Sequence, residues 1–96
     1  LKPLARQTIL ITGASSGIGL ATARLAASRG AAVMLVARDE DSLKNAAEGI
    51  REAGGRAEYH VADVADLAAL GAAADAAERA FGAIDSWVND AGTSIY

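Results

Sequence analysis

The feature that most constrains the fold of this chain is a regular alternation of short apolar runs with segments of helical periodicity. Runs typical of buried strands occupy residues 7–12, 32–37, 57–62 and 84–89. Each strand-helix-strand unit takes about 25 to 30 residues, which is the length that a right-handed parallel crossover requires. The pattern therefore predicts an α/β fold in which four parallel strands alternate with three helices.

Apolar residues at helical spacing indicate which face of each helix is buried. In the first helix, from Gly17 to about Arg29, they are Ile18, Ala21, Leu25 and Ala26, with Thr22 on the same stripe. In the second and third helices they are Leu43, Ala46, Ala47 and Ile50, and then Leu67, Leu70, Ala74, Ala77 and Phe81. Carboxylates that could cap these two helices are Asp39, Asp41, Asp63 and Asp66. Because 25 residues are alanine, we expect helices and strands to approach one another closely.

Composition excludes several functional classes. The net charge is −3 and the nine Lys and Arg residues are scattered, which argues against a nucleic-acid partner. The absence of cysteine excludes disulfides and thiolate metal sites and is compatible with a reducing cytoplasm, where we expect the protein to be located. A lone His60 cannot form a metal cluster, and no apolar stretch approaches the ~18 to 20 residues of a membrane span. We expect no metal and no membrane partner.

The chain shows no linker and no internal repeat, so we expect residues 1–96 to form one domain. The sequence begins without methionine and stops four residues after a glycine motif. We therefore expect it to be part of a longer polypeptide.

The sharpest local signal is TGASSGIG at residues 12–19, between the first strand and the first helix. Its glycines let the backbone turn tightly and let a ligand approach, while the N–H groups at the helix start form an anion site. The hydroxyls of Ser15 and Ser16 add donors for the same phosphates. We predict that a diphosphate binds at Gly13, Ser15, Ser16, Gly17, Ile18 and Gly19. The alternative is an ordinary glycine-rich turn.

A second signal follows the second strand, where dinucleotide-binding folds contact the adenine-side ribose. Ala37 stands where an acidic side chain would accept a hydrogen bond from a free 2′-hydroxyl, and Arg38 supplies a guanidinium suited to a phosphate. The pair predicts NADP(H) rather than NAD(H). The alternative is a solvated surface arginine paired with Asp39 or Glu40.

The spacing G-x-x-x-G-x-G after a buried strand resembles the cofactor loop of the short-chain dehydrogenase/reductase family. It differs from G-x-G-x-x-G because residue 15 is serine, and it lacks the Gly-Lys-Ser/Thr of nucleotide triphosphatases. A G-x-x-G-x-x-G loop, as in the epimerase-like branch, would need glycine in place of Ser16. The resemblance implies a Rossmann-type doubly wound parallel sheet with strand order 3-2-1-4, of which this chain is the N-terminal half.

The same resemblance assigns roles to residues that follow the third and fourth strands. It implies that Asp63 and Val64 contact the adenine ring, and that Asn89, Ala91 and Gly92 lie beside the cofactor ribose. Asp90 departs from the family's usual N-N-A-G and lacks the donors of an asparagine amide. Because all parallel strands end at one edge of the sheet, the four motifs should converge there.

The resemblance implies an NADP(H)-dependent oxidoreductase that transfers hydride between nicotinamide and a small carbonyl or alcohol substrate, and that assembles as a homo-oligomer. The family's catalytic Tyr-x-x-x-Lys is absent from these 96 residues, so we assign no catalytic residue. A non-catalytic dinucleotide sensor or scaffold with the same fold stays open as an alternative. An S-adenosylmethionine methyltransferase is less consistent, because its usual acidic residue after the second strand is missing.

Overall fold

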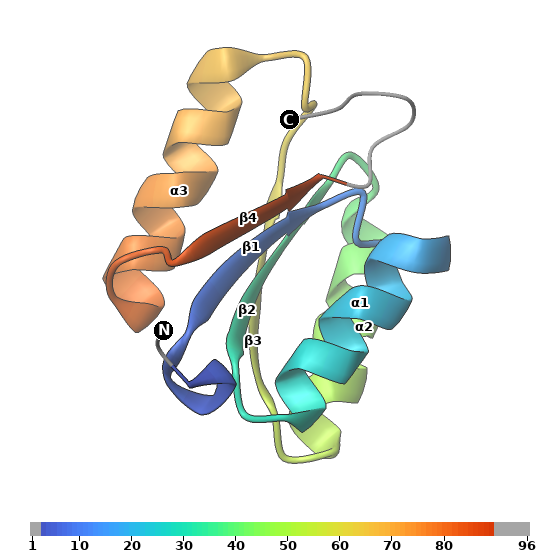
Figure 1. The fold of residues 1–96 in the computed structure, drawn as a ribbon. Coiled ribbons are helices and arrows are strands. Elements are labelled where there is room, and N and C mark those ends of the chain that lie inside the picture. The colour runs from blue at the N-terminus through green and yellow to red at the C-terminus, as the bar shows by residue number, and fades with distance from the viewer. Residues whose placement is uncertain (1–2, 90–96) are drawn as a thin grey trace.

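Four parallel strands form one sheet with the order β3-β2-β1-β4 in the computed structural model, which describes residues 3–89 (Figure 1). The predicted alternation and strand order are confirmed. The elements are η1 (Leu4–Arg6), β1 (Thr8–Thr12), α1 (Gly17–Ser28), β2 (Ala32–Ala37), α2 (Glu40–Glu52), β3 (Arg56–Val61), α3 (Leu67–Phe81) and β4 (Ser86–Asn89).

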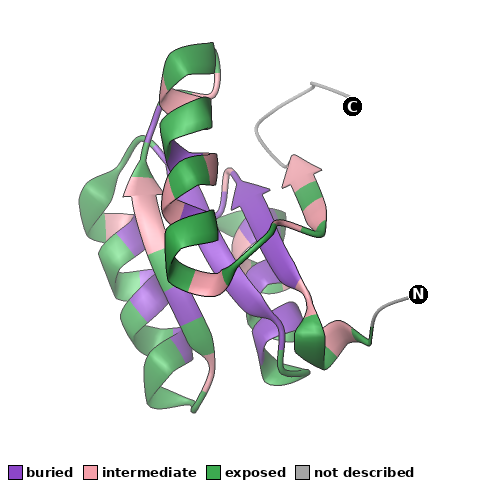
Figure 2. Cartoon of the chain, turned by 90° about the vertical axis from the view of Figure 1, so that its left-hand side faces the viewer, coloured by how far each residue is buried: buried purple, intermediate pink, exposed green. Residues whose placement is uncertain are grey.

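Helices cover both faces of the sheet, with α1 and α2 on one side and α3 on the other (Figure 1). Successive strand residues alternate between two apolar clusters, as the period of a strand requires. The cluster under α1 and α2 includes Ile9, Ile11, Val33 and Leu35, whereas Leu10, Met34 and Val36 pack toward α3. Figure 2 shows that the central strands β1 and β2 are buried throughout, whereas β4 is only partly covered.

The predicted inner face of α1 is wrong. Ile18 and Leu25 are 75% and 57% exposed, and Ala21 is exposed as well. The buried residues of this helix are Gly19, Ala23, Ala26 and Ala27, so Ala26 alone of the predicted apolar stripe is fully buried. The face of α1 that packs on the sheet therefore consists of glycine and alanine, with Leu20 half-buried beside it, while Ile18 and Leu25 lie on other sides of the helix.

The other two helices agree better with the predicted faces. All four residues predicted for α2, Leu43, Ala46, Ala47 and Ile50, are buried. In α3, Ala77 is buried and Leu70, Ala74 and Phe81 are half-buried, but Leu67 is 82% exposed and Ala73 is buried in its place. Leu67 is the first residue of the helix, whose first buried position is Ala73.

Strand ends differ from the predicted bounds by one or two residues. The β1 strand begins at Thr8 because Gln7 closes the short η1 turn, its N–H donating to Leu4 O at 3.0 Å. The β4 strand begins at Ser86 rather than residue 84. Asp85, directly before it, is bonded twice to Thr8: Thr8 N–H donates to Asp85 Oδ2, and Asp85 N–H donates to Thr8 O, both at 2.8 Å.

Two carboxylates were predicted as possible caps for each of α2 and α3, and in each case one of the two forms the cap. Asp39 caps α2 by accepting from Asp41 N–H, and Asp66 caps α3 by accepting from Ala69 N–H. Asp41 therefore lies in the first turn rather than at the cap. Over residues 3–89, no helix has the length and apolar character that crossing a bilayer would require.

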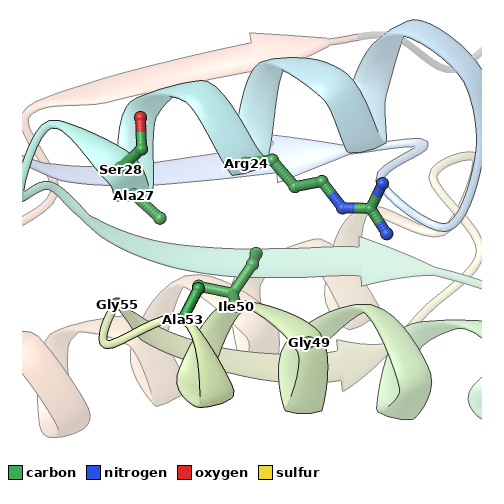
Figure 3. A pocket seen from close by; sticks show the side chains of 7 residues that line it. All are labelled: Arg24, Ala27, Ser28, Gly49, Ile50, Ala53 and Gly55. Carbon is green, nitrogen blue, oxygen red and sulfur yellow. The ribbon is translucent and has the colours of Figure 1, made fainter.

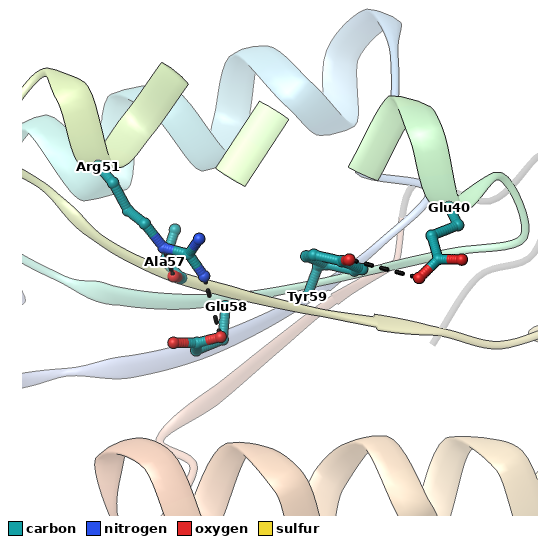
Figure 4. A network of polar contacts seen from close by, with 5 residues as sticks. All are labelled: Glu40, Arg51, Ala57, Glu58 and Tyr59. Atoms are coloured by element: carbon teal, nitrogen blue, oxygen red, sulfur yellow. Dashed lines mark hydrogen bonds and ion pairs between the residues drawn. The ribbon is translucent and has the colours of Figure 1, made fainter. Parts of the chain in front are cut away.

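The β3 strand has β2 as its one partner within the described range, and side chains of α2 bond to it (Figure 4). Arg51 Nε donates to Ala57 O at 2.8 Å, and Arg51 Nη2 lies 2.9 Å from Glu58 Oε1. The Tyr59 hydroxyl donates to Glu40 Oε2 at 3.4 Å. These contacts occupy polar groups along an edge strand that could otherwise pair with another chain.

Candidate nucleotide site at the carboxyl edge of the sheet

The strand register brings the ends of all four strands to one edge. Thr12 is paired with Val36 on one side and with Asn89 on the other, and Ala37 is paired with Val61. The segments that follow these residues therefore lie next to one another, as the parallel topology requires.

The turn after β1 leaves the start of α1 open to a ligand. Gly13 has a φ of +68°, and Ala14 N–H anchors the turn by donating to Val36 O at 3.4 Å. Ser16 is the N-cap residue, but its exposed side chain makes no capping hydrogen bond. The first N–H groups of a helix have no partner within the helix, so this end can accept an anion.

Gly19 sets how closely this turn packs against the helix. A Cβ on Gly19 would lie 2.3 Å from Gly13 O and 3.2 Å from Ala14 Cα, so no side chain fits without moving the backbone. Ile18, beside it, faces solvent at the same end of the helix. The closeness of Gly13 and Gly19 gives the predicted diphosphate loop its shape.

Three of the predicted motifs line one pocket of about 530 Å³. Its walls are Gly13, Ala37, Arg38, Ala62, Asp63, Val64 and Ala65. Arg38 Nη1 lies 4.0 Å from Asp63 Oδ2, and the two side chains are 80% and 52% exposed. Exposed pairs of this length contribute little to stability, so the guanidinium stays available to a stronger anionic partner.

The side chain of Asp63 is held in a turn at the mouth of this pocket. Its Oδ1 accepts from Ala65 N–H at 2.9 Å, whereas Asp66 makes the capping bond of α3. Asp63 is therefore a turn residue rather than a helix cap. Its carboxylate faces Arg38 across the pocket that Val64 also lines.

Asn89 lies on the other side of β1. Thr12 Oγ1 is 2.6 Å from Asn89 Oδ1 and donates to it, which links the ends of the two strands. Both residues also line a second, mainly apolar pocket of about 480 Å³, with Val64, Leu67, Leu70, Gly71 and Trp87. Ala91 and Gly92, predicted for the same site, lie outside the described residues, as does Asp90.

Two contacts at this edge were missed by the sequence analysis. One is the bond between Thr12 and Asn89, for which the only signal was a hydroxyl residue directly before the glycine turn. The other is a second bond to the capping carboxylate of α2, in which Asp39 Oδ2 accepts from Ser42 Oγ at 2.8 Å. This hydroxyl is the main reason that the pKa of Asp39 is lowered from its ordinary value of 3.8. The signal for the bond between Ser42 and Asp39 was a serine three residues after an N-cap aspartate.

A third pocket, of about 490 Å³, lies between the second halves of α1 and α2 (Figure 3). It is lined by Arg24, Ala27, Ser28, Gly49, Ile50, Ala53 and Gly55, none of which is a predicted site residue. It is therefore separate from the carboxyl edge.

Comparison with known proteins agrees with this arrangement. The sequence profile of the family described as short chain dehydrogenase matches residues 7–96. The chain is 46% identical over 96 residues to the uncharacterized oxidoreductase YxnA of Bacillus subtilis (strain 168), covering all of this chain and 27% of that protein.

Two solved structures show the same fold. The L-sorbose reductase of Gluconobacter frateurii, complexed with NADPH and L-sorbose, is 41% identical with a TM-score of 0.85, over 93% of this chain and 34% of that one. A short chain dehydrogenase/reductase from Burkholderia phymatum, in complex with NAD, is 34% identical with a TM-score of 0.86, over 91% of this chain and 31% of that one.

The chain thus spans between a quarter and about a third of the length of these proteins. The match to the family profile covers the glycine turn, the residues after β2 and β3, and the end of β4. This chain belongs to the short-chain dehydrogenase/reductase family.

Proposed function

We propose that residues 1–96 form the NADP(H)-binding part of an oxidoreductase that moves hydride between nicotinamide and a small carbonyl or alcohol substrate. The observation that carries this proposal is the pocket in which Gly13, Arg38, Asp63 and Val64 meet at the carboxyl edge. This pocket brings together the glycine turn before the anion-binding start of α1 and the guanidinium of Arg38. The arginine follows the glycine turn by about 20 residues, the spacing at which dinucleotide-binding folds contact the adenine-side ribose.

The residues present fit such a cofactor. The helix start, from Gly13 to Gly19 with Ser15, Ser16, Gly17 and Ile18, would hold the diphosphate. Asp63 and Val64 would contact the adenine, and Asn89, Ala91 and Gly92 would lie on the ribose side. When bound, the nicotinamide ring supplies or accepts the hydride.

The solved relatives do not decide between NADP(H) and NAD(H), because one holds NADPH and another holds NAD. Ala37 lines the pocket without a carboxylate that could bind a free 2′-hydroxyl or repel a phosphate. Arg38 is exposed at the same wall. A charge-assisted hydrogen bond is worth about 1.5–3 kcal/mol, which corresponds to roughly a 10- to 100-fold preference.

The proposed reaction also needs acid-base residues that these 96 residues do not contain. No Tyr-x-x-x-Lys occurs in the sequence, so we propose that the acid-base chemistry comes from another part of a longer polypeptide. We also propose that the full-length protein is a homo-oligomer, as the family resemblance implies.

Titration of the full-length protein with NADPH and NADH tests the proposal. We expect NADPH to bind at least about tenfold more tightly, a difference of ~1.4 kcal/mol. Arg38→Ala and Ala37→Asp should each reduce that preference. Arg24→Ala, which removes an exposed arginine from the separate α1/α2 pocket, is the matched control and should leave it unchanged. Equal affinities in the parent protein would contradict the NADP(H) assignment.

A further inference from the structure

Three carboxylates stand close to Arg38 in the chain or in space: Asp39, Glu40 and Asp63. Each could pair with the guanidinium, and each would repel a ligand phosphate that approaches it. Whether Arg38 can bind a phosphate therefore depends on where these carboxylates are held.

Asp39 is held by the start of α2. It is the N-cap residue of this helix, and its backbone is extended, with φ −91° and ψ 106°. Its Oδ1 accepts from Asp41 N–H at 3.1 Å, and its Oδ2 accepts from Ser42 Oγ at 2.8 Å. Both carboxylate oxygens are thus engaged by α2.

The other two carboxylates compete only weakly with a ligand phosphate for the Arg38 guanidinium. Glu40 Oε2 accepts from the hydroxyl of Tyr59 on β3 (Figure 4). Asp63 is bonded to Ala65 N–H through Oδ1, and its Oδ2 approaches Arg38 no closer than 4.0 Å. Of the three carboxylates, Asp39 directly follows Arg38 in the sequence and is held by α2 through both of its oxygens.

We propose that Ser42 is a positioning residue for cofactor specificity: its hydroxyl keeps the Asp39 carboxylate on α2, which leaves Arg38 available to the 2′-phosphate of NADP(H). This inference rests on the proposed function. It goes further by assigning the preference to a hydroxyl four residues beyond the arginine, outside the pocket that the arginine lines.

The test measures the dissociation constants of NADPH and NADH for the full-length protein and four variants: Ser42→Ala, Ser42→Thr, Asp39→Asn and the double variant S42A/D39N. In Ser42→Ala we expect the preference for NADPH to fall roughly three- to tenfold, with the NADH affinity changed less than about twofold. Ser42→Thr keeps the hydroxyl and should keep the preference. In the Asp39→Asn background there is no carboxylate to release, so adding Ser42→Ala should have no effect on the ratio.

The outcomes separate the two proposals. A parent protein that prefers NADPH, with the same preference in Ser42→Ala, overturns the role of Ser42 but not the proposed function. The role of Ser42 would also be overturned if Ser42→Ala lowered the preference for NADPH equally in the parent protein and in the Asp39→Asn background. A loss of helix structure alone would act in that way. If the parent binds both nucleotides equally, the NADP(H) assignment fails and this inference fails with it. Should Ser42→Ala not fold, Ser42→Cys replaces it in the same comparison, because a thiol is a weak hydrogen-bond donor.

Discussion

Gly19 illustrates how one missing side chain shapes the binding edge. The first turn of α1 packs directly on the Gly13 carbonyl, and this contact positions the open N–H groups of the helix beside the pocket that Arg38 lines. A glycine is needed at residue 19 for space, whereas at residue 13 a positive φ favours it. The two glycines therefore serve the same turn for different physical reasons.

We predict that Gly19→Ala destabilises the protein and weakens nucleotide binding. The added methyl would lie 2.3 Å from Gly13 O, so the helix or the turn must move. Overpacking of this kind costs about 1–3 kcal/mol of unfolding free energy. Urea unfolding and NADPH titration of the full-length protein would measure both effects.

Gly71→Ala is the matched control for that substitution. A Cβ on Gly71 meets no atom within 4 Å, and alanine is favoured over glycine inside a helix by about 1 kcal/mol. Its stability should stay the same or rise. If both variants behave alike, the close contact at Gly19 does not determine the shape of the turn.

The residues of the candidate site were predictable where a local motif carried the signal. The places of Gly13, Gly19 and Arg38 after the ends of β1 and β2 could be predicted because their spacing from a strand end is fixed by the chain itself. The contact of Thr12 with Asn89 depends on strand register across 77 residues of sequence separation, which local patterns do not encode. The direction in which Asp39 points depends on the cap that it forms.

Among the helices, the buried face of α2 was predictable, whereas for α1 the helix was predictable and its buried face was not. The α2 helix carries Leu43 and Ile50 on its buried face, opposite charged residues, so the apolar stripe is unambiguous. In α1, alanines occur on several sides, and packing selects the smallest residues rather than the most apolar ones. Hydrophobic periodicity is therefore a weaker guide wherever methyl groups make the core.

Arg51 of α2 bonds to the β3 strand through the carbonyl of Ala57 and the carboxylate of Glu58. We predict that Arg51→Ala lowers the free energy of unfolding by about 1 kcal/mol, because it removes the donor to Ala57 O and the partner of Glu58. Chemical unfolding of the full-length protein would measure it. Arg51→Lys keeps the charge but lacks the planar guanidinium, so its free energy of unfolding should lie between those of the parent protein and Arg51→Ala. An unchanged unfolding midpoint in Arg51→Ala would show that the strand does not need this cover.

At the scale of the whole molecule, the α3 face of the sheet is covered less completely than the face under α1 and α2. Trp87 of β4 is 52% exposed and Leu67 of α3 is 82% exposed, and both line the apolar pocket beside Asn89. Within residues 3–89, β4 has β1 as its one strand partner. Open strand edges with exposed apolar side chains favour association.

We predict that the isolated 96-residue chain self-associates or unfolds with low cooperativity. Sedimentation at several concentrations, together with thermal unfolding, would measure this. Trp87→Lys adds charge beside the open edge and should reduce the association. A sharp unfolding transition of a monomer, independent of concentration, would contradict the prediction.

A structure of the full-length protein with NADPH bound would test whether the carboxyl edge of the sheet receives an NADP(H) dinucleotide. We expect the diphosphate to lie against the N–H groups between Gly13 and Gly19, and the 2′-phosphate to lie about 3 Å from the Arg38 guanidinium. A nucleotide bound away from this edge, or a 2′-phosphate directed away from Arg38, would contradict this expectation.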